Sequence, residues 1–269
     1  MKNILVPTDF SQNAKDALIY AANFLAGKDA KLHVLSVVSL PPRSVGTTGS
    51  LMLRIEEKAQ KDMEDLIESM KQINVTIEPL IREGGTVSVI MDVVEEIGAD
   101  MVIMGTKGST GLESVVLGSV ASKVIERCPI PVISVPQGCK FNGLGRVLYP
   151  TDFQKSTSVS LKVLLEITES YSSKVDVLHI YPKGTEAPYS DLEQLESEVE
   201  EEMKTRKILF HAHPNDSIAD ALVAFIDAAE VEMLSMVTRR RGLIERLFDR
   251  SLTKRIAKSS KIPLLSFHA

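Results

Sequence analysis

The chain has 269 residues, a formal net charge of −5 and a charged fraction of 25%, values typical of a soluble globular protein of one large or two ordinary domains. An acidic chain lacks the basic footprint of a nucleic-acid-binding protein and would be repelled by an anionic membrane surface. No apolar run approaches the length needed to cross a bilayer. The composition therefore predicts neither a nucleic-acid partner nor a membrane partner.

In chain order, the first half of the sequence alternates short apolar segments with amphipathic ones. The short segments predict five strands, over 3–6, 32–38, 75–81, 101–104 and 130–135. The longer segments predict helices over 12–25, 51–73, 87–97 and 119–127, with Ser11 as the N-cap of the first, and 40–50 predicts a loop. Strands that alternate with helices pair in parallel through right-handed crossovers, which predicts an α/β fold with an open, doubly wound, five-stranded parallel sheet.

The beginning of the chain and its cysteines indicate the compartment. The sequence enters the first predicted strand at Asn3, without the long apolar region of a signal peptide. Cys128 and Cys139 are the only cysteines, and their spacing matches neither a metal site nor a redox motif. We therefore expect a cytoplasmic protein.

The strand over 101–104 is followed by a glycine-rich stretch. Its glycines are Gly105, Gly108, Gly111 and Gly118. Glycine lets the backbone approach a ligand without an intervening Cβ, and the first amides of the helix that begins at Ser119 form an anion site. This combination predicts a phosphate cradle, and the alternative is a glycine-rich connection that only turns the chain.

Three side chains near these glycines are candidate ligand contacts. Asp9 follows the first strand, and the carboxyl ends of parallel strands share one crevice. Asp9 could accept a hydrogen bond from an adenine or ribose group, or only cap the helix that follows it. Ser119 could donate its hydroxyl to a phosphate, cap its own helix, or do both. Lys107 could pair with a phosphate, although a loop lysine is usually just solvated.

The start of the sequence returns after residue 145. Residues 146–153 (RVLYPTDF) match the opening strand and place Asp152 on Asp9, while 175–181 repeats 32–38 and 251–267 repeats 119–135 without a gap. An acidic amphipathic helix is predicted near 191–204. An internal duplication of this kind predicts two domains of one fold, which we place at 1–137 and 146–269 with a linker over 138–145.

The second copy departs from the first at the glycines. In the alignment without a gap, Gly105, Gly108 and Gly118 become Val237, Arg240 and Arg250. Each replacement puts a side chain where the first copy has none. We therefore expect that the second crevice cannot admit phosphates by the same approach of the backbone.

The pattern Gly-x2-Gly-x9-Gly-Ser over 105–119 resembles the nucleotide motif of the ATP-binding universal stress proteins. The flanking segments Pro-Thr-Asp-Phe-Ser (7–11) and Pro-Ile-Pro-Val (129–132) resemble that family too. The likeness covers nearly the whole chain twice, so the sequence is similar to a tandem universal stress protein. The resemblance implies two Rossmann-like domains, of the kind also called adenine nucleotide alpha hydrolase-like.

The resemblance also implies that domain 1 binds ATP or a related adenine nucleotide, with or without Mg. It carries over Asp9, Pro7, Thr8 and Val37 to the adenine and ribose side, Met104 and Gly105 to a place under the nucleotide, and the remaining residues to phosphate and ribose. With Lys107 added from the residues alone, the predicted nucleotide-binding set is Pro7, Thr8, Asp9, Val37, Met104, Gly105, Lys107, Gly108, Gly118, Ser119 and Val120.

The sequence favours binding and conformational signalling over fast catalysis. It contains no P-loop run Gly-x4-Gly-Lys-Ser/Thr, no Gly-x-Ser-x-Gly elbow and no carboxylate that can be assigned to magnesium. We assign no catalytic residue and predict a stress-response or regulatory protein. The alternatives are a slow ATPase or autophosphorylating enzyme, and a nucleotide-free interaction module.

Two further expectations concern the second domain. His211 and His213 lie on one predicted strand face and His179 ends the neighbouring strand, so the three could bind zinc, although strand-end histidines are commonly packing residues.

In the family, the last strand commonly pairs across a dimer axis. The resemblance thus implies that the two copies pair within one chain as a pseudo-dimer. Two chains could then associate further into a homodimer. We also expect a protein partner, which the sequence does not identify.

Overall fold

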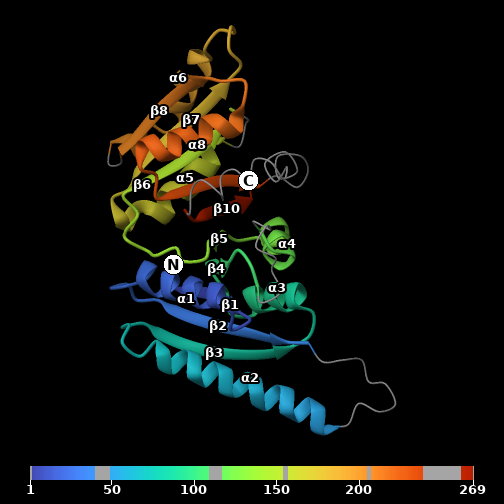
Figure 1. Ribbon diagram of the computed structural model, residues 1–269. Helices are drawn as coiled ribbons and strands as arrows, with labels where there is room; N and C mark the ends of the chain where they lie inside the picture. The colour runs from blue at the N-terminus through green and yellow to red at the C-terminus, as the bar shows by residue number, and fades with distance from the viewer. Residues whose placement is uncertain are drawn as a thin grey trace. The chain divides into compact units, whose positions relative to one another are not determined.

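The computed structural model describes residues 2–39, 49–108, 117–153, 157–204, 207–238 and 262–268. The chain divides into two compact units, Met1–Phe141 and Asn142–Ala269 (Figure 1). Of the loop predicted over 40–50, residues 40–48 lie outside the described residues, and 49–50 are instead the first residues of a helix. Gly111, Arg240, Arg250 and the start of the repeat at 251 also lie outside the described residues.

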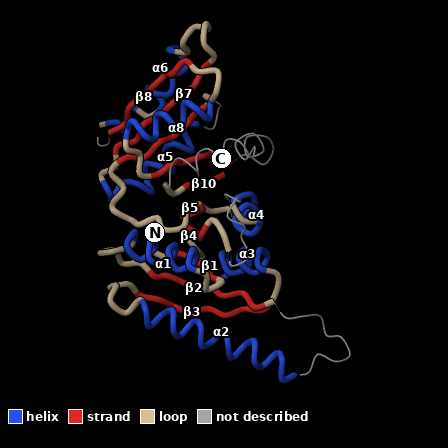
Figure 2. The backbone as a smooth tube through the Cα atoms, in the orientation of Figure 1, coloured by secondary structure: helices blue, strands red, loops and turns tan. Residues whose placement is uncertain are grey.

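The first unit is a parallel five-stranded sheet with four helices among its described residues (Figure 2). The strands are β1 (Asn3–Thr8), β2 (Lys31–Val38), β3 (Thr76–Glu83), β4 (Met101–Gly105) and β5 (Val132–Val135), in the spatial order β3-β2-β1-β4-β5. The helices are α1 (Gln12–Phe24), α2 (Gly49–Ser69), α3 (Thr86–Glu96) and α4 (Ser119–Arg127). The predicted α/β class and parallel pairing are confirmed.

The chain builds the sheet first on one side of β1 and then on the other, and the change of side between β1 and β4 sets where a ligand crevice can form. β2 and β3 lie on one side of β1, whereas β4 and β5 lie on the other, with Ile4 paired to Met101 and Leu5 to Val102. Crossover connections therefore diverge at the carboxyl ends of β1 and β4, where an open α/β sheet leaves a crevice. Both strands are deeply buried, as their short apolar runs predict: Ile4, Leu5 and Ile103 have no exposed surface.

Helix α1 shows how the sequence builds the first βα unit. Ser11 is its N-cap, and the Ser11 hydroxyl accepts a hydrogen bond from the Ala14 amide at 3.3 Å. Its buried face is rich in small side chains, including Ala14, Ala17 and Ala21. Small residues let the helix lie close to β4, which brings the loop after β1 toward the glycines after β4.

The second unit repeats this architecture. Its strands are β6 (Arg146–Thr151), β7 (Lys174–Tyr181), β8 (Lys207–Pro214), β9 (Met233–Thr238) and β10 (Leu264–His268), parallel in the order β8-β7-β6-β9-β10. Its described helices are α5 (Thr157–Thr168), the 3-10 turn η1 (Glu169–Tyr171), α6 (Tyr189–Glu198), α7 (Glu200–Met203) and α8 (Ile218–Ala229). The strand order matches that of the first unit, so the duplication seen in the sequence is a duplication of the fold.

The prediction of one acidic helix over 191–204 is wrong. The chain breaks at Val199, whose φ of −118° and ψ of 17° lie outside the helical region, so that α6 and the short α7 are separate. Val199 is fully buried. Valine is β-branched and favours a helix less than the Leu and Glu residues around it, and the break leaves the apolar face of the segment buried at Leu192, Leu195 and Val199.

The segment 138–145, predicted as a linker, is anchored at both ends. The Gly138 amide donates to Asp16 on α1 at 2.8 Å, and the Phe141 ring packs edge-on against Tyr20 and Phe24 at centroid distances of 5.3 and 5.7 Å. Leu144 is 2% exposed and belongs to the second unit. Among the described residues, the structure has no helix that combines the length and the apolar character needed to span a membrane.

Candidate functional site

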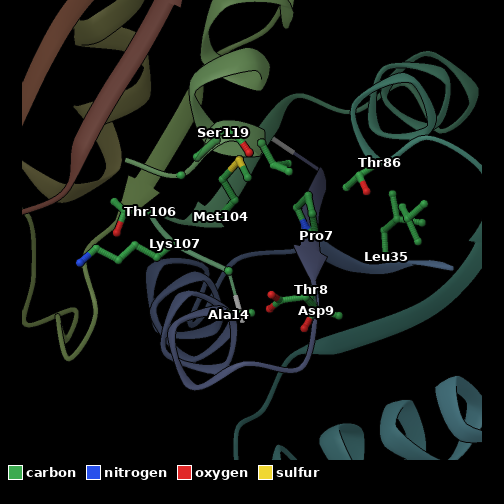
Figure 3. A pocket seen from close by; sticks show the side chains of 16 residues that line it. Pro7, Thr8, Asp9, Ala14, Leu35, Thr86, Met104, Thr106, Lys107 and Ser119 are labelled. Atoms are coloured by element: carbon green, nitrogen blue, oxygen red, sulfur yellow. The ribbon is translucent and has the colours of Figure 1, made fainter. Parts of the chain in front are cut away.

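A pocket of about 490 Å³ opens at the carboxyl ends of β1 and β4 (Figure 3). All eleven residues predicted for nucleotide binding line it: Pro7, Thr8, Asp9, Val37, Met104, Gly105, Lys107, Gly108, Gly118, Ser119 and Val120. Five more lining residues were not predicted: Ala14, Leu35, Thr86, Thr106 and Ala121. The volume is ordinary for a small-molecule site.

One wall of the pocket is apolar and comes from the central strands. Leu35 on β2 has no exposed surface and Met104 at the end of β4 is 5% exposed, with Pro7 between these strands on β1. In Figure 3 Leu35 and Thr86 lie on one side of the pocket, and Thr106 and Lys107 lie on the opposite side. A flat apolar group would fit against the strand side, with polar groups directed to the loop side.

Asp9 lies where the turn after β1 meets the glycine loop. Its Oδ1 accepts a hydrogen bond from the Ser11 amide at 3.1 Å, which closes the turn before the helix, whereas the N-cap of α1 is Ser11 and not Asp9. Its Oδ2 faces the other way: a Cβ built on Gly108 would lie 2.7 Å from that oxygen. Phe10, which lies between Asp9 and Ser11 in the chain, has a φ of +61°, and its amide donates a hydrogen bond to the Thr8 hydroxyl at 3.0 Å. The turn therefore holds the Asp9 carboxylate at the pocket. The sequence alone did not decide between this position and a purely structural one.

Gly105 has a structural role that the sequence did not reveal. A Cβ there would lie 2.8 Å from Asn13 Oδ1 and 3.0 Å from the Asn13 carbonyl oxygen. Asn13 is buried in α1, accepts a hydrogen bond from the Lys107 amide at 2.7 Å and donates one to the Val135 carbonyl at 3.1 Å. This side chain ties the start of the glycine loop to α1 and β5, and the contact requires a residue without a Cβ at position 105.

Gly118 holds the loop against the start of α4. Its amide donates to the Thr106 carbonyl at 2.6 Å, and its own Cβ would lie 3.3 Å from that oxygen and 3.6 Å from Lys107 Cα. Gly118 is the N-cap of α4 and offers no side chain to the first-turn amides. Ser119 and Val120 of that first turn line the pocket, so those amides border a space that a side chain would fill.

A second helix begins at the same pocket. α3 starts at Thr86 after the N-cap Gly85, which makes no side-chain cap hydrogen bond. Thr86 lines the pocket. Two helix N-termini capped by glycine therefore meet one cavity, and both contribute positive potential there. The paired glycines at 84–85 before a helix were the sequence signal for this second terminus.

Replacing Gly105 with alanine is expected to destabilise the first unit by about 1–3 kcal/mol, the usual cost of forcing extra atoms into a packed site. The cause is the contact with Asn13, where the backbone carbonyl cannot move without shifting α1. Chemical denaturation of the variant beside the parent measures the difference. The control is Asn13→Ala with Gly105→Ala, which removes the side-chain part of the clash and should recover part of the loss. An alanine variant as stable as the parent would contradict this role of Asn13.

The second unit keeps the turn but not the glycine. The Phe153 amide is held by the Thr151 hydroxyl at 3.0 Å, and Phe153 has a φ of +55°, as in the first unit. Val237 pairs with Phe267 as Gly105 pairs with Val135, so the register places valine at the position of the first glycine. The counterparts of Gly108 and Gly118 lie outside the described residues.

The three histidines considered for zinc do not gather. His179 Nδ1 lies 2.8 Å from the Thr151 carbonyl, and its ring stacks on Phe153 at 4.3 Å. His211 and His213 instead contact Phe225 of α8, on the face of the sheet opposite to His179 because successive strand residues alternate. Among the described residues, no three His, Cys, Asp or Glu side chains are placed to hold a metal ion.

Comparison with known proteins identifies the fold. The chain is similar over 99% of its length to a universal stress protein from Archaeoglobus fulgidus DSM 4304, covering 96% of that chain at 20% identity and a TM-score of 0.77. It is similar over 100% of its length to a protein of unknown function from Pseudomonas aeruginosa PAO1, covering 92% of that chain at 15% identity and a TM-score of 0.59. A universal stress protein in complex with cAMP aligns with 51% of this chain and 98% of its own, at 23% identity and a TM-score of 0.42. A comparison with curated proteins found no match.

The family comparison covers both units. The model of the universal stress protein family matches residues 1–136 and again 143–268. These two matches follow the repeated strand order and the repeated turns after β1 and β6. The chain therefore belongs to the universal stress protein family and carries two copies of its domain in tandem.

Proposed function

We propose that the first unit binds ATP or a related adenine nucleotide and that the protein is a nucleotide-dependent regulator of a stress response. The observation that carries this proposal is the convergence of two helix N-termini, at Gly85 and Gly118, on a pocket whose loop glycines cannot accept a Cβ freely. Such a site suits an anion with an attached flat group.

The residues present fit an adenine nucleotide. The apolar wall from Pro7, Leu35 and Met104 suits the base, and the Asp9 carboxylate can accept a hydrogen bond from a ribose hydroxyl or the adenine amino group. The backbone amides at the start of α4 and the Ser119 hydroxyl suit the phosphates. When bound, the nucleotide would supply a phosphate chain whose presence or loss changes the contacts of the glycine loop.

The second unit has a different role in this proposal. Valine stands at the position of Gly105, where the first unit has room for no Cβ beside Asn13, so the second unit cannot form the same contact between the loop and its first helix. We propose that the second unit serves as a degenerate partner that completes a pseudo-dimer with the first.

Thermal unfolding with and without Mg-ATP tests nucleotide binding. A ligand that binds only the native state at 100 times its Kd adds about 2.7 kcal/mol to the unfolding free energy, so a clear upward shift of the transition is expected. Nucleotide released from the purified protein by denaturation is assayed first, because a preparation already loaded would show no shift. A ligand-free, well-folded protein that ATP does not stabilise would contradict the proposal and favour the nucleotide-free interaction module.

A further inference from the structure

A second cavity, of about 420 Å³, lies in the second unit between α8 and the edge strand β8. Its polar lining consists of Arg146, His211, His213 and Asn215, and its apolar lining consists of Phe225 and four alanines of α8. The cavity lies away from the carboxyl ends of β6 and β9, which carry the counterpart of the nucleotide crevice. It is therefore a separate site.

A buried carboxylate organises one end of this cavity. Asp176 has no exposed surface and accepts hydrogen bonds from Arg146 Nε at 2.5 Å and Nη2 at 3.0 Å. His211 Nε2 lies 2.7 Å from Asp176 Oδ1. Arg146 Nη1 donates to the Ala229 carbonyl at 2.9 Å. The pair of residues that face the cavity, Arg146 and His211, is thus held in place from behind by Asp176.

These bonds fix which atoms remain for a ligand. Arg146 has five N–H donors, and three are used in the bonds above, which leaves one on Nη1 and one on Nη2 among the described contacts. An ionised carboxylate only accepts hydrogen bonds, so His211 must donate through Nε2, and in its neutral form its Nδ1 is then an acceptor. The Asn215 Oδ1 accepts from the Ser217 amide at 2.9 Å, which leaves the Asn215 amide group as a donor.

Among its described residues, the second unit lacks a surface ion pair that the first unit has between the corresponding strand and helix. In the first unit Arg82 of β3 forms an ion pair with Glu96 of α3, with Nη2 and Oε1 2.9 Å apart. The strand registers and helix starts place His213 at the position of Arg82 and Ala228 at that of Glu96. Both replacements are smaller, and the alanine removes the only carboxylate of this pair.

We propose that this cavity, named here the α8–β8 site, binds a small organic carboxylate with an apolar body. The carboxylate pairs with the two remaining N–H donors of Arg146, a planar fork that matches a carboxylate geometrically. The apolar body packs on Phe225 and the alanines of α8, and a donor on the ligand can reach His211. Asp176 lies behind Arg146 and His211, and the charge of Glu230 also acts on Arg146, but among the described residues that line the cavity itself no side chain is acidic.

Benzoate is the probe for this site, and benzamide is its uncharged match. In the full chain, the ring resonances of His211 and His213 are followed by NMR, assigned with His211→Gln and His213→Gln. Benzoate is expected to shift both resonances saturably, whereas His33 and His179, which lie elsewhere, stay unchanged. Benzamide should bind at least about fivefold more weakly because it lacks the charge that Arg146 recognises. Equal shifts with both compounds, or shifts that never saturate, would overturn the proposal.

Ala228→Glu locates the binding and Ala228→Gln is its matched control. Ala228 is exposed on α8, so neither variant disturbs the core. Glutamate restores the carboxylate that the first unit has at Glu96 and is expected to weaken benzoate binding by about fivefold or more. Glutamine has nearly the same size without the charge and should weaken binding less. Benzoate affinity unchanged in the glutamate variant would place the binding elsewhere and refute the site.

Discussion

Gly118→Arg is expected to abolish the stabilisation of the protein by Mg-ATP, so that a gain of about 2.7 kcal/mol at 100 times the Kd falls to near zero. The first atom of a side chain at this position would already lie 3.3 Å from the Thr106 carbonyl and 3.6 Å from Lys107 Cα. The rest of the arginine would have to enter the space between the glycine loop and the first turn of α4. Calorimetric titration with ATP, beside thermal unfolding, measures the loss.

The variant should fold normally, because Gly118 has a φ of −68° and a ψ of 160°, which any residue adopts. A guanidinium group would attract phosphate, so the expected loss must come from volume and not from charge. Gly118→Leu separates the two causes and should abolish binding equally, whereas Gly118→Ala should retain most of it. An arginine variant that still binds ATP while the leucine variant does not would show that the second unit's own arginine is compatible with a nucleotide.

The site was largely predictable because its residues lie at strand ends and helix starts. Glycines after a buried strand and a Thr-Asp pair after another strand are both visible as local patterns, and parallel pairing brings them to one edge. Leu35 and Thr86 were missed for the opposite reason. They reach the pocket through tertiary packing, Leu35 from within β2 and Thr86 at the start of a helix two strands away. No local pattern specifies which distant element closes a cavity.

The role of each residue was harder to predict than which residues line the pocket. The spacing shows that position 105 is glycine, but only the packing of α1 shows that Asn13 requires it. In the second unit the relevant signal was a pair of replacements. Arg146 stands where the first unit has Asn3, and Asp176 stands where it has His33, so opposite charges face each other on adjacent strands.

Asp176→Ala is expected to have the largest effect on stability, lowering the unfolding free energy of the second unit by about 3–5 kcal/mol. Asp176 has no exposed surface and binds both Arg146 and His211. Its removal leaves the Arg146 guanidinium partly buried without its counter-charge, a state that costs far more than the intact pair contributes. Amide hydrogen exchange in β6 and β7 measures the stability of this unit separately from the first.

Two controls distinguish an unpaired buried charge from the loss of any ion pair. Glu78→Ala removes the contacts of the exposed Glu78 carboxylate with Lys31 and His33, and should cost far less stability than Asp176→Ala. Arg146→Met combined with Asp176→Leu removes both charges and should recover much of the loss. A double variant no more stable than Asp176→Ala would mean that the loss comes from packing and not from the stranded charge.

The effect should also depend on pH with a definite sign. Burial raises the pKa of Asp176, but hydrogen bonds from Arg146 and His211 and the charges of these groups outweigh it, so that the pKa lies below its ordinary value. A carboxyl group whose pKa is lower in the folded state contributes stability above its unfolded pKa, about 3.9, and loses it as the pH falls through the folded pKa. The stability gap between the parent and Asp176→Ala should therefore narrow as the pH falls below about pH 4. A gap that instead widened below about pH 4 would mean that the carboxyl group is protonated in the native state, and Arg146 would then need another counter-ion.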